Sequence, residues 1–179
     1  RRSSDLSPSV NKNIPRLLEA YRRLREQNRI SHGLVLIGHA PKEVNDRLTD
    51  LIVAGYLPRA HVLAILRRAE FLAFPSFYEG FGLPVLEAMM CGVPVVCSNA
   101  ASLPEIAGEA AFYFNPFSID DLVNAIEIVA NDRTLRESLR QRGYENVKRF
   151  SWEATADETL AVYDELCEGN AWERRRERS

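Results

Sequence analysis

The chain has 179 residues, 46% of them hydrophobic, and its 23 basic and 25 acidic residues leave a net charge of -2. These values are typical of a soluble globular protein of about one domain, and they argue against disorder and against a broadly basic nucleic-acid-binding face. The longest apolar runs fall short of the roughly 18 residues that a membrane-spanning helix needs.

Apolar runs rich in Val, Ile and Phe alternate with amphipathic stretches along the chain. This alternation predicts βα units, with a parallel sheet flanked by helices in one doubly wound α/β layer structure. The predicted strands cover residues 34–37, 51–53, 70–74, 93–97 and 110–114, and those at 51–53 and 93–97 are expected to be buried. The predicted helices cover residues 14–24, a stretch from about 41, 62–69, 84–90, 103–107, 118–130, 132–148 and 152–166. Ligands of such sheets bind at the carboxyl ends of the strands, so the loops that follow the strands matter most.

The most informative segment runs from residue 74 to residue 96. It places Glu79 in a glycine-bearing loop and Glu87, eight positions later, about one turn inside a predicted helix. Gly80 and Gly82 let backbone N–H groups approach a ligand closely, and the unpaired amides of a helix start attract anions such as phosphate. Because carboxylates accept hydrogen bonds from sugar hydroxyls, the combination suits a sugar nucleotide. The alternative is that both glutamates are surface acids that complement the helix dipole.

The segment reads FPSFYEGFGLPVLEAMMCGVPVV, and it closely resembles the E-x7-E region of GT-B glycosyltransferases of the large retaining family usually called GT4. The likeness covers most of the chain. Its other matching segments are Lys12-Asn13, residues 34–38, Gly55-Tyr56, Leu103-Pro104-Glu105, Asn115-Pro116 and Phe150-Ser151-Trp152. The resemblance implies a Rossmann-like parallel sheet flanked by helices, the second half of a GT-B enzyme.

The resemblance also implies a role for each matching residue. Glu79 holds hydroxyls of the transferred sugar and Lys12 neutralises the diphosphate leaving group, so these two are the catalytic candidates. Glu87 binds the donor ribose, and the other donor-binding candidates are Gly38, Tyr56, Gly80, Phe81, Gly82 and Leu83. A lysine at a helix start opposes the helix dipole, which a bound anion would offset. The alternative for Lys12 is an exposed lysine in a polar segment.

On the same grounds, residues 1–150 form the donor nucleotide-sugar-binding domain, with its first strand missing or reduced, and the N-terminal acceptor domain is absent. We therefore expect the chain to be a piece of a longer protein. The arginine that the family often places before the lysine is missing, and Arg2 is not expected to replace it. Residues 151–179 are expected to form a helix that crosses back to the absent domain, followed by a basic tail. Its Ala156, Leu160 and Tyr163 are candidates for exposed apolar surface or for a homodimer contact.

Several other polar, aromatic and cysteine residues have simpler structural interpretations. His39 is interpreted as a solvated loop residue, and Glu105 as an acid that complements a helix start. Tyr78 and Phe81 either wall the sugar pocket or pack in the core. The three cysteines, Cys91, Cys97 and Cys167, form no C-x-x-C pair and have no histidine at metal-ligand spacing. They indicate a reducing, cytoplasmic compartment and no bound metal, and Cys91 and Cys97 are interpreted as packing residues.

The resemblance implies the donor-binding half of a transferase that moves a hexose from a nucleoside diphosphate sugar to a glycan or lipid-linked glycan hydroxyl, with retention. We expect no cofactor, no metal and no nucleic-acid partner, an inactive fragment, and a cytoplasmic location that leaves peripheral contact with the inner face of the membrane open. The alternatives are a non-catalytic nucleotide-binding module and an enzyme like glycogen synthase or phosphorylase. A dinucleotide oxidoreductase is disfavoured because no G-x-G-x-x-G follows a predicted strand. The base, the sugar and the acceptor are not determined by the sequence.

Overall fold

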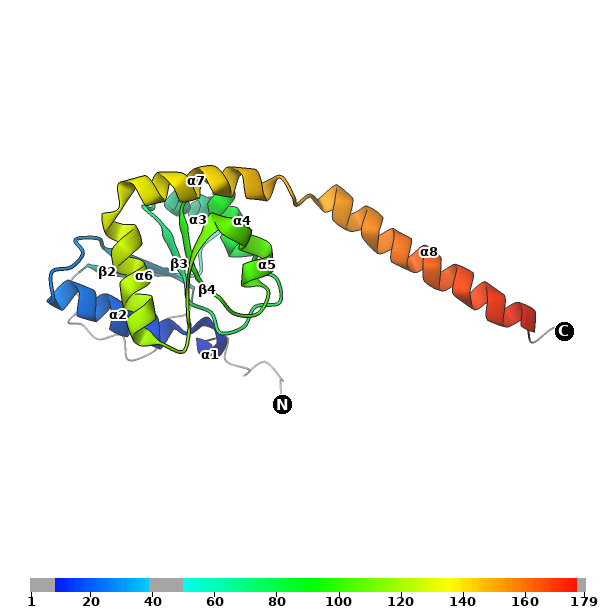
Figure 1. Cartoon of the computed structure of the whole chain (residues 1–179), viewed down its shortest axis with the longest axis horizontal. Helices are drawn as coiled ribbons and strands as arrows, with labels where there is room; N and C mark the ends of the chain where they lie inside the picture. The colour runs from blue at the N-terminus through cyan, green and yellow to red at the C-terminus, as the bar shows by residue number, and fades with distance from the viewer. Residues whose placement is uncertain (1–8, 39–49, 177–179) are drawn as a thin grey trace. The chain divides into compact units, whose positions relative to one another are not determined.

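The computed structural model describes residues 9–38 and 50–176, with side chains from residue 10 to residue 167 within these ranges. The chain divides into two compact units, Arg1–Val147 and Lys148–Ser179. The first unit carries all the described strands and every described helix but the last (Figure 1). The helix predicted from about residue 41, together with His39 and Arg2, lies outside the described residues.

The described strands run parallel to their hydrogen-bonded neighbours and form two sheets. β1 (Leu34–Ile37) pairs with β2 (Leu51–Gly55), and β3 (Leu72–Phe74), β4 (Val95–Ser98) and β5 (Ala111–Phe114) pair in the order β3-β4-β5. The expected α/β class, with parallel strands flanked by helices, is confirmed. The expected single layer is not, because β1 and β3 do not pair within the described residues. Alternating apolar runs predict strands but not which strands are neighbours. The two sheets still share one core, in which Leu36 of β1 and Val96 of β4 are both buried.

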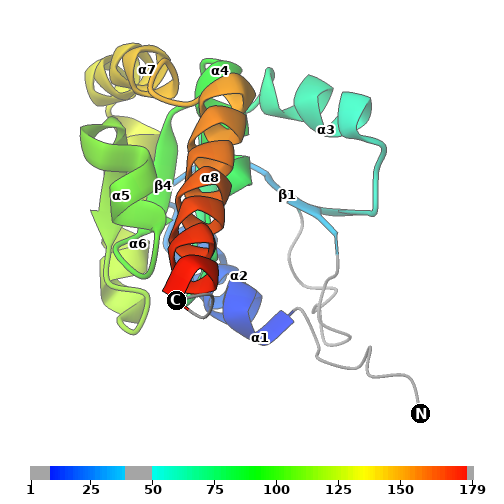
Figure 2. The ribbon, with the colours of Figure 1, turned by 90° about the vertical axis from the view of Figure 1, so that its right-hand side faces the viewer.

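Helices follow the strands, as the alternating pattern predicts. They are α1 (Ser9–Lys12), α2 (Ile14–Glu26), α3 (Arg59–Leu66), α4 (Leu83–Met90), α5 (Leu103–Ala107), the 3-10 turn η1 (Gly108–Ala110), α6 (Ile119–Asn131), α7 (Arg133–Val147) and α8 (Trp152–Arg176). In the first unit α2 packs against α6, and α4 packs against α5 and α7 (Figures 1 and 2). The helix predicted at 62–69 is present but begins and ends earlier, at Arg59 and Leu66.

The strand predicted at 51–53 forms as β2, but the prediction that it is buried is wrong. Ile52 and Val53 are 61% and 44% exposed. β2 has a hydrogen-bonded neighbour on one side, whereas β4 lies between two strands and is buried along its whole length. The apolar runs therefore predicted both β2 and β4 correctly as strands. They did not predict that β4 is central and buried while β2 is partly exposed.

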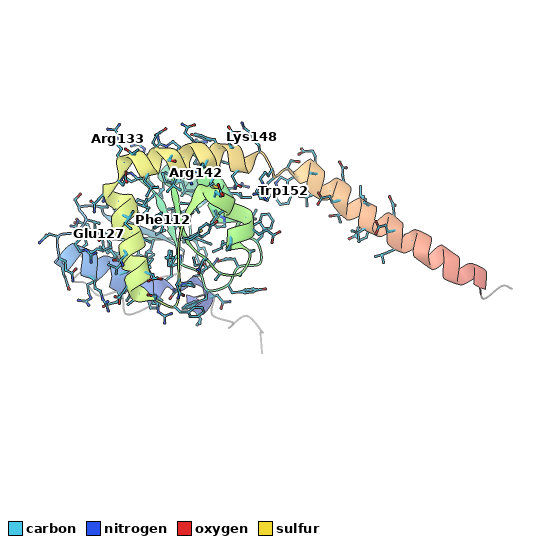
Figure 3. The ribbon with its side chains drawn as sticks, in the orientation of Figure 1. Phe112, Glu127, Arg133, Arg142, Lys148 and Trp152 are labelled. Atoms are coloured by element: carbon cyan, nitrogen blue, oxygen red, sulfur yellow. The ribbon has the colours of Figure 1, made fainter. Side chains whose placement is uncertain are left out.

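The core cluster of the first unit is built largely from the apolar faces of α2 and α6, with Leu139 of α7. Its fully buried leucines include Leu24 of α2, Leu122 of α6 and Leu139 of α7. Glu127 lies on α6, at the rim of this core (Figure 3). The guanidinium of Arg29 donates to its carboxylate, with a distance of 2.7 Å between Nε and Oε1. That hydrogen bond holds the pKa of Glu127 below its usual value. The hydrogen-bonded pair links the segment just after α2 to α6.

The second unit is α8, whose side chains are exposed from Trp152 to Cys167. The predicted apolar positions Ala156, Leu160 and Tyr163 are all among the exposed ones. Acidic side chains are spread along the same helix. Within the described residues, no helix has both the length and the apolar character needed to cross a bilayer.

The three cysteines differ sharply in environment, and this predicts their reactivity. Cys97 is buried in β4, and burial raises the pKa of its thiol to about 12, whereas Cys167 is exposed. Because the thiolate is the nucleophile, we expect a disulfide-exchange reagent at mildly alkaline pH to label Cys167 rapidly and Cys97 only after denaturation. A Cys167→Ser variant should lose the fast phase. Labelling of Cys97 in the folded protein at the rate of Cys167 would contradict its placement in the core.

Candidate active site

A corner between α1 and α2 brings two loops together. Its apex, Asn13, has a left-handed backbone (φ 55°) and is 3% exposed. Its side-chain amide donates to the carbonyl oxygens of Pro75 and Pro116, each at 3.1 Å. Pro75 and Pro116 follow β3 and β5, so the corner lies at the carboxyl ends of parallel strands, where ligands of such sheets bind. The backbone N–H of Phe77 adds a bond of 2.7 Å to the carbonyl of Asn11.

Lys12, the residue before this corner, forms an ion pair with Glu79. The distance between Nζ and Oε1 is 2.6 Å, and the two side chains are 41% and 14% exposed. The ammonium group also lies 5.2 Å from the centre of the Phe74 ring. The structure thus brings together the two residues that the sequence singled out as catalytic candidates, although they are 67 positions apart. A cation and a carboxylate at one site could receive an anionic group and a hydroxyl-bearing group side by side.

The loop from Glu79 to Leu83 is fixed by one serine. The hydroxyl oxygen of Ser102 lies 3.0 Å from the carbonyl oxygen of Glu79 and 2.8 Å from that of Phe81, so these two acceptors share its single proton. Gly82 precedes α4 with a φ of 107°, and a Cβ atom there would lie 2.8 Å from Cδ2 of Leu103. Only glycine suits both the backbone and the space. The loop therefore leads directly into the first turn of α4, which begins at Leu83. In that turn Pro84 has no N–H, and the N–H of Val85 donates to the carbonyl of Gly82 at 2.9 Å.

Glu87, within α4, contacts a residue that the sequence did not suggest. Its Oε1 lies 3.0 Å from Nη2 of Arg59, the first residue of α3. β2 ends at Gly55, and the exposed Tyr56 lies in the turn between β2 and α3. The carbonyl of Gly55 accepts a hydrogen bond of 2.7 Å from the N–H of Gly38, so the candidate turns after β1 and β2 lie next to each other. No hydrogen bond or ion pair within the described residues joins Glu79 to Glu87.

The sequence singled out Asn13 only as part of the matching Lys12-Asn13 segment, without a role in the site, and it did not suggest Arg59 or Ser102 at all. Asn13 had a usable signal, because asparagine is one of the few residues that adopt the left-handed conformation and it directly precedes a helix. Arg59 and Ser102 had no such signal, since each contacts a residue more than 20 positions away.

Tyr78 and Phe81 are exposed, which excludes the interpretation that they pack in the core. Glu105 is exposed in the first turn of α5, as a dipole-complementing acid would be.

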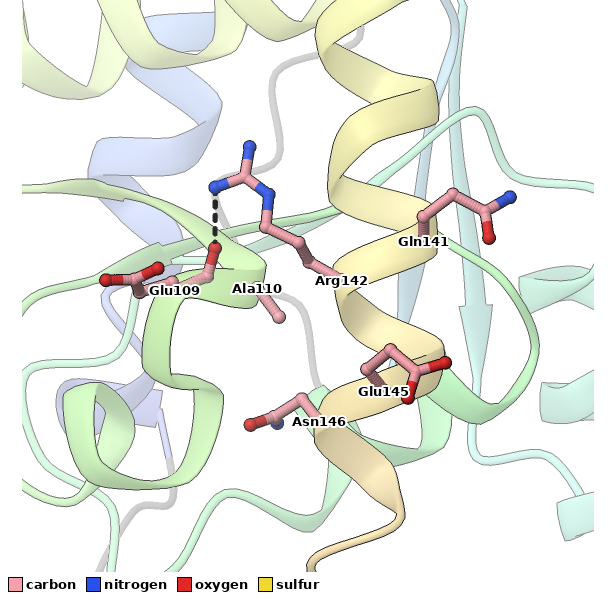
Figure 4. A pocket seen from close by; sticks show the side chains of 6 residues that line it. All are labelled: Glu109, Ala110, Gln141, Arg142, Glu145 and Asn146. Atoms are coloured by element: carbon pink, nitrogen blue, oxygen red, sulfur yellow. Dashed lines mark hydrogen bonds between the residues drawn. The ribbon is translucent and has the colours of Figure 1, made fainter.

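A separate hollow lies between η1 and α7 (Figure 4), lined by Glu109, Ala110, Gln141, Arg142, Glu145 and Asn146. Arg142 spans it, with Nη1 2.9 Å from the carbonyl oxygen of Glu109. Because η1 leads into β5, the hollow lies at the amino end of that strand, at the opposite edge of the sheet from Lys12 and Glu79.

Across residues 9–38 and 50–176, no cluster of three or more His, Cys, Asp or Glu side chains is arranged to hold a metal ion.

Known proteins resemble this chain over most of its length. It matches the family described as glycosyl transferases group 1 over residues 9–146. It is 40% identical over 162 residues to the O-antigen chain mannosyltransferase B of Escherichia coli. The aligned region covers 85% of this chain and 42% of that protein. It is 34% identical over 163 residues to the MMP alpha-(1->4)-mannosyltransferase of Mycolicibacterium hassiacum, with 86% and 40% covered. The chain thus spans about two fifths of the length of these relatives.

Two solved structures resemble it as well. The sucrose-phosphate synthase of Thermosynechococcus elongatus superposes with a TM-score of 0.72 at 27% identity, covering 89% of this chain and 43% of the other. The alpha,alpha-trehalose 6-phosphate synthase of Burkholderia multivorans gives a TM-score of 0.77, with 90% and 41% covered. At 13% identity this second likeness concerns the fold alone.

Proposed function

The chain belongs to the glycosyl transferases group 1 family, and from that premise we propose that it is the donor-binding half of a hexosyltransferase. Its fold is the α/β arrangement of the GT-B glycosyltransferases, as expected. The proposed reaction moves a hexose from a nucleoside diphosphate sugar to a hydroxyl of a glycan or lipid-linked glycan, with retention at the anomeric carbon. Mannose is the hexose we favour, because two of the relatives named above are mannosyltransferases.

The Lys12–Glu79 pair is the observation that carries this proposal. A nucleoside diphosphate sugar presents an anionic diphosphate directly bonded to a ring with hydroxyl groups. In the proposed complex the ammonium group of Lys12 turns to the diphosphate, and the carboxylate of Glu79 accepts hydrogen bonds from the sugar. The backbone N–H groups of Gly80, Phe81, Gly82 and Leu83, at and just before the start of α4, are the further proposed donors for phosphate oxygens.

Catalysis in this proposal comes from positioning and from stabilising the departing diphosphate. The charge of Lys12 offsets the negative charge that develops on the leaving group, so no metal is required for that task. Neither glutamate needs to act as a nucleophile, in contrast to the paired carboxylates of glycosidases. Glu87 accepts from the ribose hydroxyls, while Gly38 and Tyr56, on adjacent turns, border the nucleotide.

The acceptor would be bound by an N-terminal domain that the matched region does not include. In the proposed whole enzyme, α8 contacts that domain through its exposed apolar side chains, and a homodimer contact through Leu160 and Tyr163 is the alternative. We further propose a cytoplasmic enzyme, with peripheral contact to the membrane for a lipid-linked acceptor. The isolated chain should bind the donor weakly and transfer nothing.

Thermal unfolding in the presence of nucleotides tests the proposal. A ligand that binds only the folded state stabilises it by about 2.7 kcal/mol at one hundred times its dissociation constant. We expect one of UDP, GDP and ADP, and its sugar conjugate, to raise the melting temperature, and NAD to have no effect. Glu87→Ala should remove the shift, whereas Glu105→Ala, which deletes an exposed carboxylate from α5, should keep it. A shift with NAD alone would rule out the donor-binding assignment.

A further variant, Glu79→Ala, and a further set of ligands separate the alternatives. A non-catalytic nucleotide-binding module has no use for Glu79, so Glu79→Ala would leave the affinities for the sugar conjugate and the bare nucleotide equally unchanged. An enzyme that works like a phosphorylase would have phosphate rather than a nucleotide as its leaving group, and it would be stabilised by phosphate or a sugar phosphate instead.

A further inference from the structure

Arg59 is the one cation in ion-pair contact with Glu87 among the described residues. The guanidinium Nη2 lies 3.0 Å from Oε1 of Glu87, and the two side chains are 78% and 25% exposed. α3, which Arg59 begins, packs against α4, which carries Glu87 (Figure 2). The exposed arginine therefore reaches a carboxylate that is mostly covered.

The position of Arg59 is unfavourable for its own helix. A cation in the first turn opposes the partial positive charge of the helix N-terminus, and α3 has no acidic residue in that turn to offset it. The carboxylate of Glu87 supplies the missing negative charge from the neighbouring helix. The turn that follows the left-handed Gly55 (φ 65°) at the end of β2 leads to Pro58, the residue before α3, and brings Arg59 to that point.

We infer that Arg59 is a positioning residue for donor binding: it holds one carboxylate oxygen of Glu87 and so fixes the other oxygen toward the ribose hydroxyls. This inference rests on the proposed function, in which Glu87 accepts from the ribose. A glutamate side chain has three rotatable bonds, and ordering it costs free energy when the ligand binds. A partner that orders the carboxylate beforehand removes part of that cost. Arg59 itself does not touch the nucleotide in this arrangement.

Calorimetric titration with UDP, GDP and ADP, and with the 2′,3′-dideoxy form of whichever binds best, separates positioning from direct contact. We expect Arg59→Ala to weaken binding of the ribonucleotide about two- to fivefold, the range of a partly exposed ion pair. The same change should leave binding of the dideoxy form unaltered, because no ribose hydroxyl is present to be held. Arg59→Ala should add nothing in a Glu87→Ala background, and Arg59→Lys should restore part of the loss.

Arg67→Ala is the matched control, since it removes an exposed arginine from the other end of α3 and should leave all affinities unchanged. Equal weakening of the ribonucleotide and the dideoxy form, or a loss that persists without Glu87, would show that Arg59 contacts the nucleotide directly and would overturn the inference. An unchanged affinity in Arg59→Ala beside a lowered one in Glu87→Ala would overturn it too, while leaving the proposed function in place. An unchanged affinity in Glu87→Ala, or no binding of any of the three nucleotides, would count against the proposed function itself.

Discussion

Replacing Lys12 by methionine is expected to weaken binding of the nucleoside diphosphate about 10- to 100-fold, because a charge-assisted hydrogen bond to phosphate contributes roughly 1.5–3 kcal/mol. Methionine keeps an unbranched apolar chain near the Phe74 ring, so the change chiefly removes the charge. The loss should be measured by calorimetry on the folded chain. Lys148→Met, which removes a lysine from the second unit, should leave the affinity unchanged.

Glu79→Gln should have the opposite effect on the bare nucleotide. The ion pair at 2.6 Å occupies Lys12 before the donor arrives, so neutralising Glu79 should leave the affinity for the nucleoside diphosphate unchanged or raise it up to about fivefold. The sugar conjugate should then no longer bind more tightly than the bare nucleotide, because its hydroxyls lose a charged acceptor. Equal weakening of the bare nucleotide by Lys12→Met and Glu79→Gln would contradict separate roles for the two residues.

Replacing Asn13 by alanine is expected to destabilise the fold by about 2–4 kcal/mol. The left-handed backbone costs a residue with a Cβ atom roughly 1–2 kcal/mol, and the buried carbonyls of Pro75 and Pro116 each lose a donor. Glycine adopts the same backbone without that cost, so Asn13→Gly should destabilise the fold about 1 kcal/mol less than Asn13→Ala does. Urea unfolding with unchanged m-values provides the measurement.

A second left-handed asparagine in the same chain provides the control for Asn13. Asn28 has a φ of 52° but is exposed, and its side chain makes no hydrogen bond within the described residues. Asn28→Ala should therefore cost only the backbone contribution of about 1 kcal/mol. If Asn13→Ala cost no more than Asn28→Ala, the two bonds to the prolines would not stabilise the site.

The positions of most helices and strands were predictable, because they depend on patterns among neighbouring residues. The strand at 34–37 and the helix at 103–107 form with the predicted bounds, and most other elements begin and end within a few residues of theirs. Apolar periodicity, a proline in the first helical turn and a glycine after the last turn are properties of neighbouring residues. At the end of α4, Gly92 has a φ of 72° and its N–H donates to the carbonyl of Met89 at 2.9 Å, as a terminating glycine does.

The sequence by itself determined the order of strands and helices, the α/β class, and the loop and helix that carry Glu79 and Glu87. Only the tertiary structure decided that Lys12 pairs with Glu79, that Arg59 pairs with Glu87, and that the amide of Asn13 joins the loops after β3 and β5. It also decided that the described strands divide into two sheets and that Ile52 and Val53 of β2 are exposed. The reason is physical. Backbone preferences and side-chain periodicity act over a few residues, whereas these contacts join residues 28 to 103 positions apart and exist only once packing has brought their elements together.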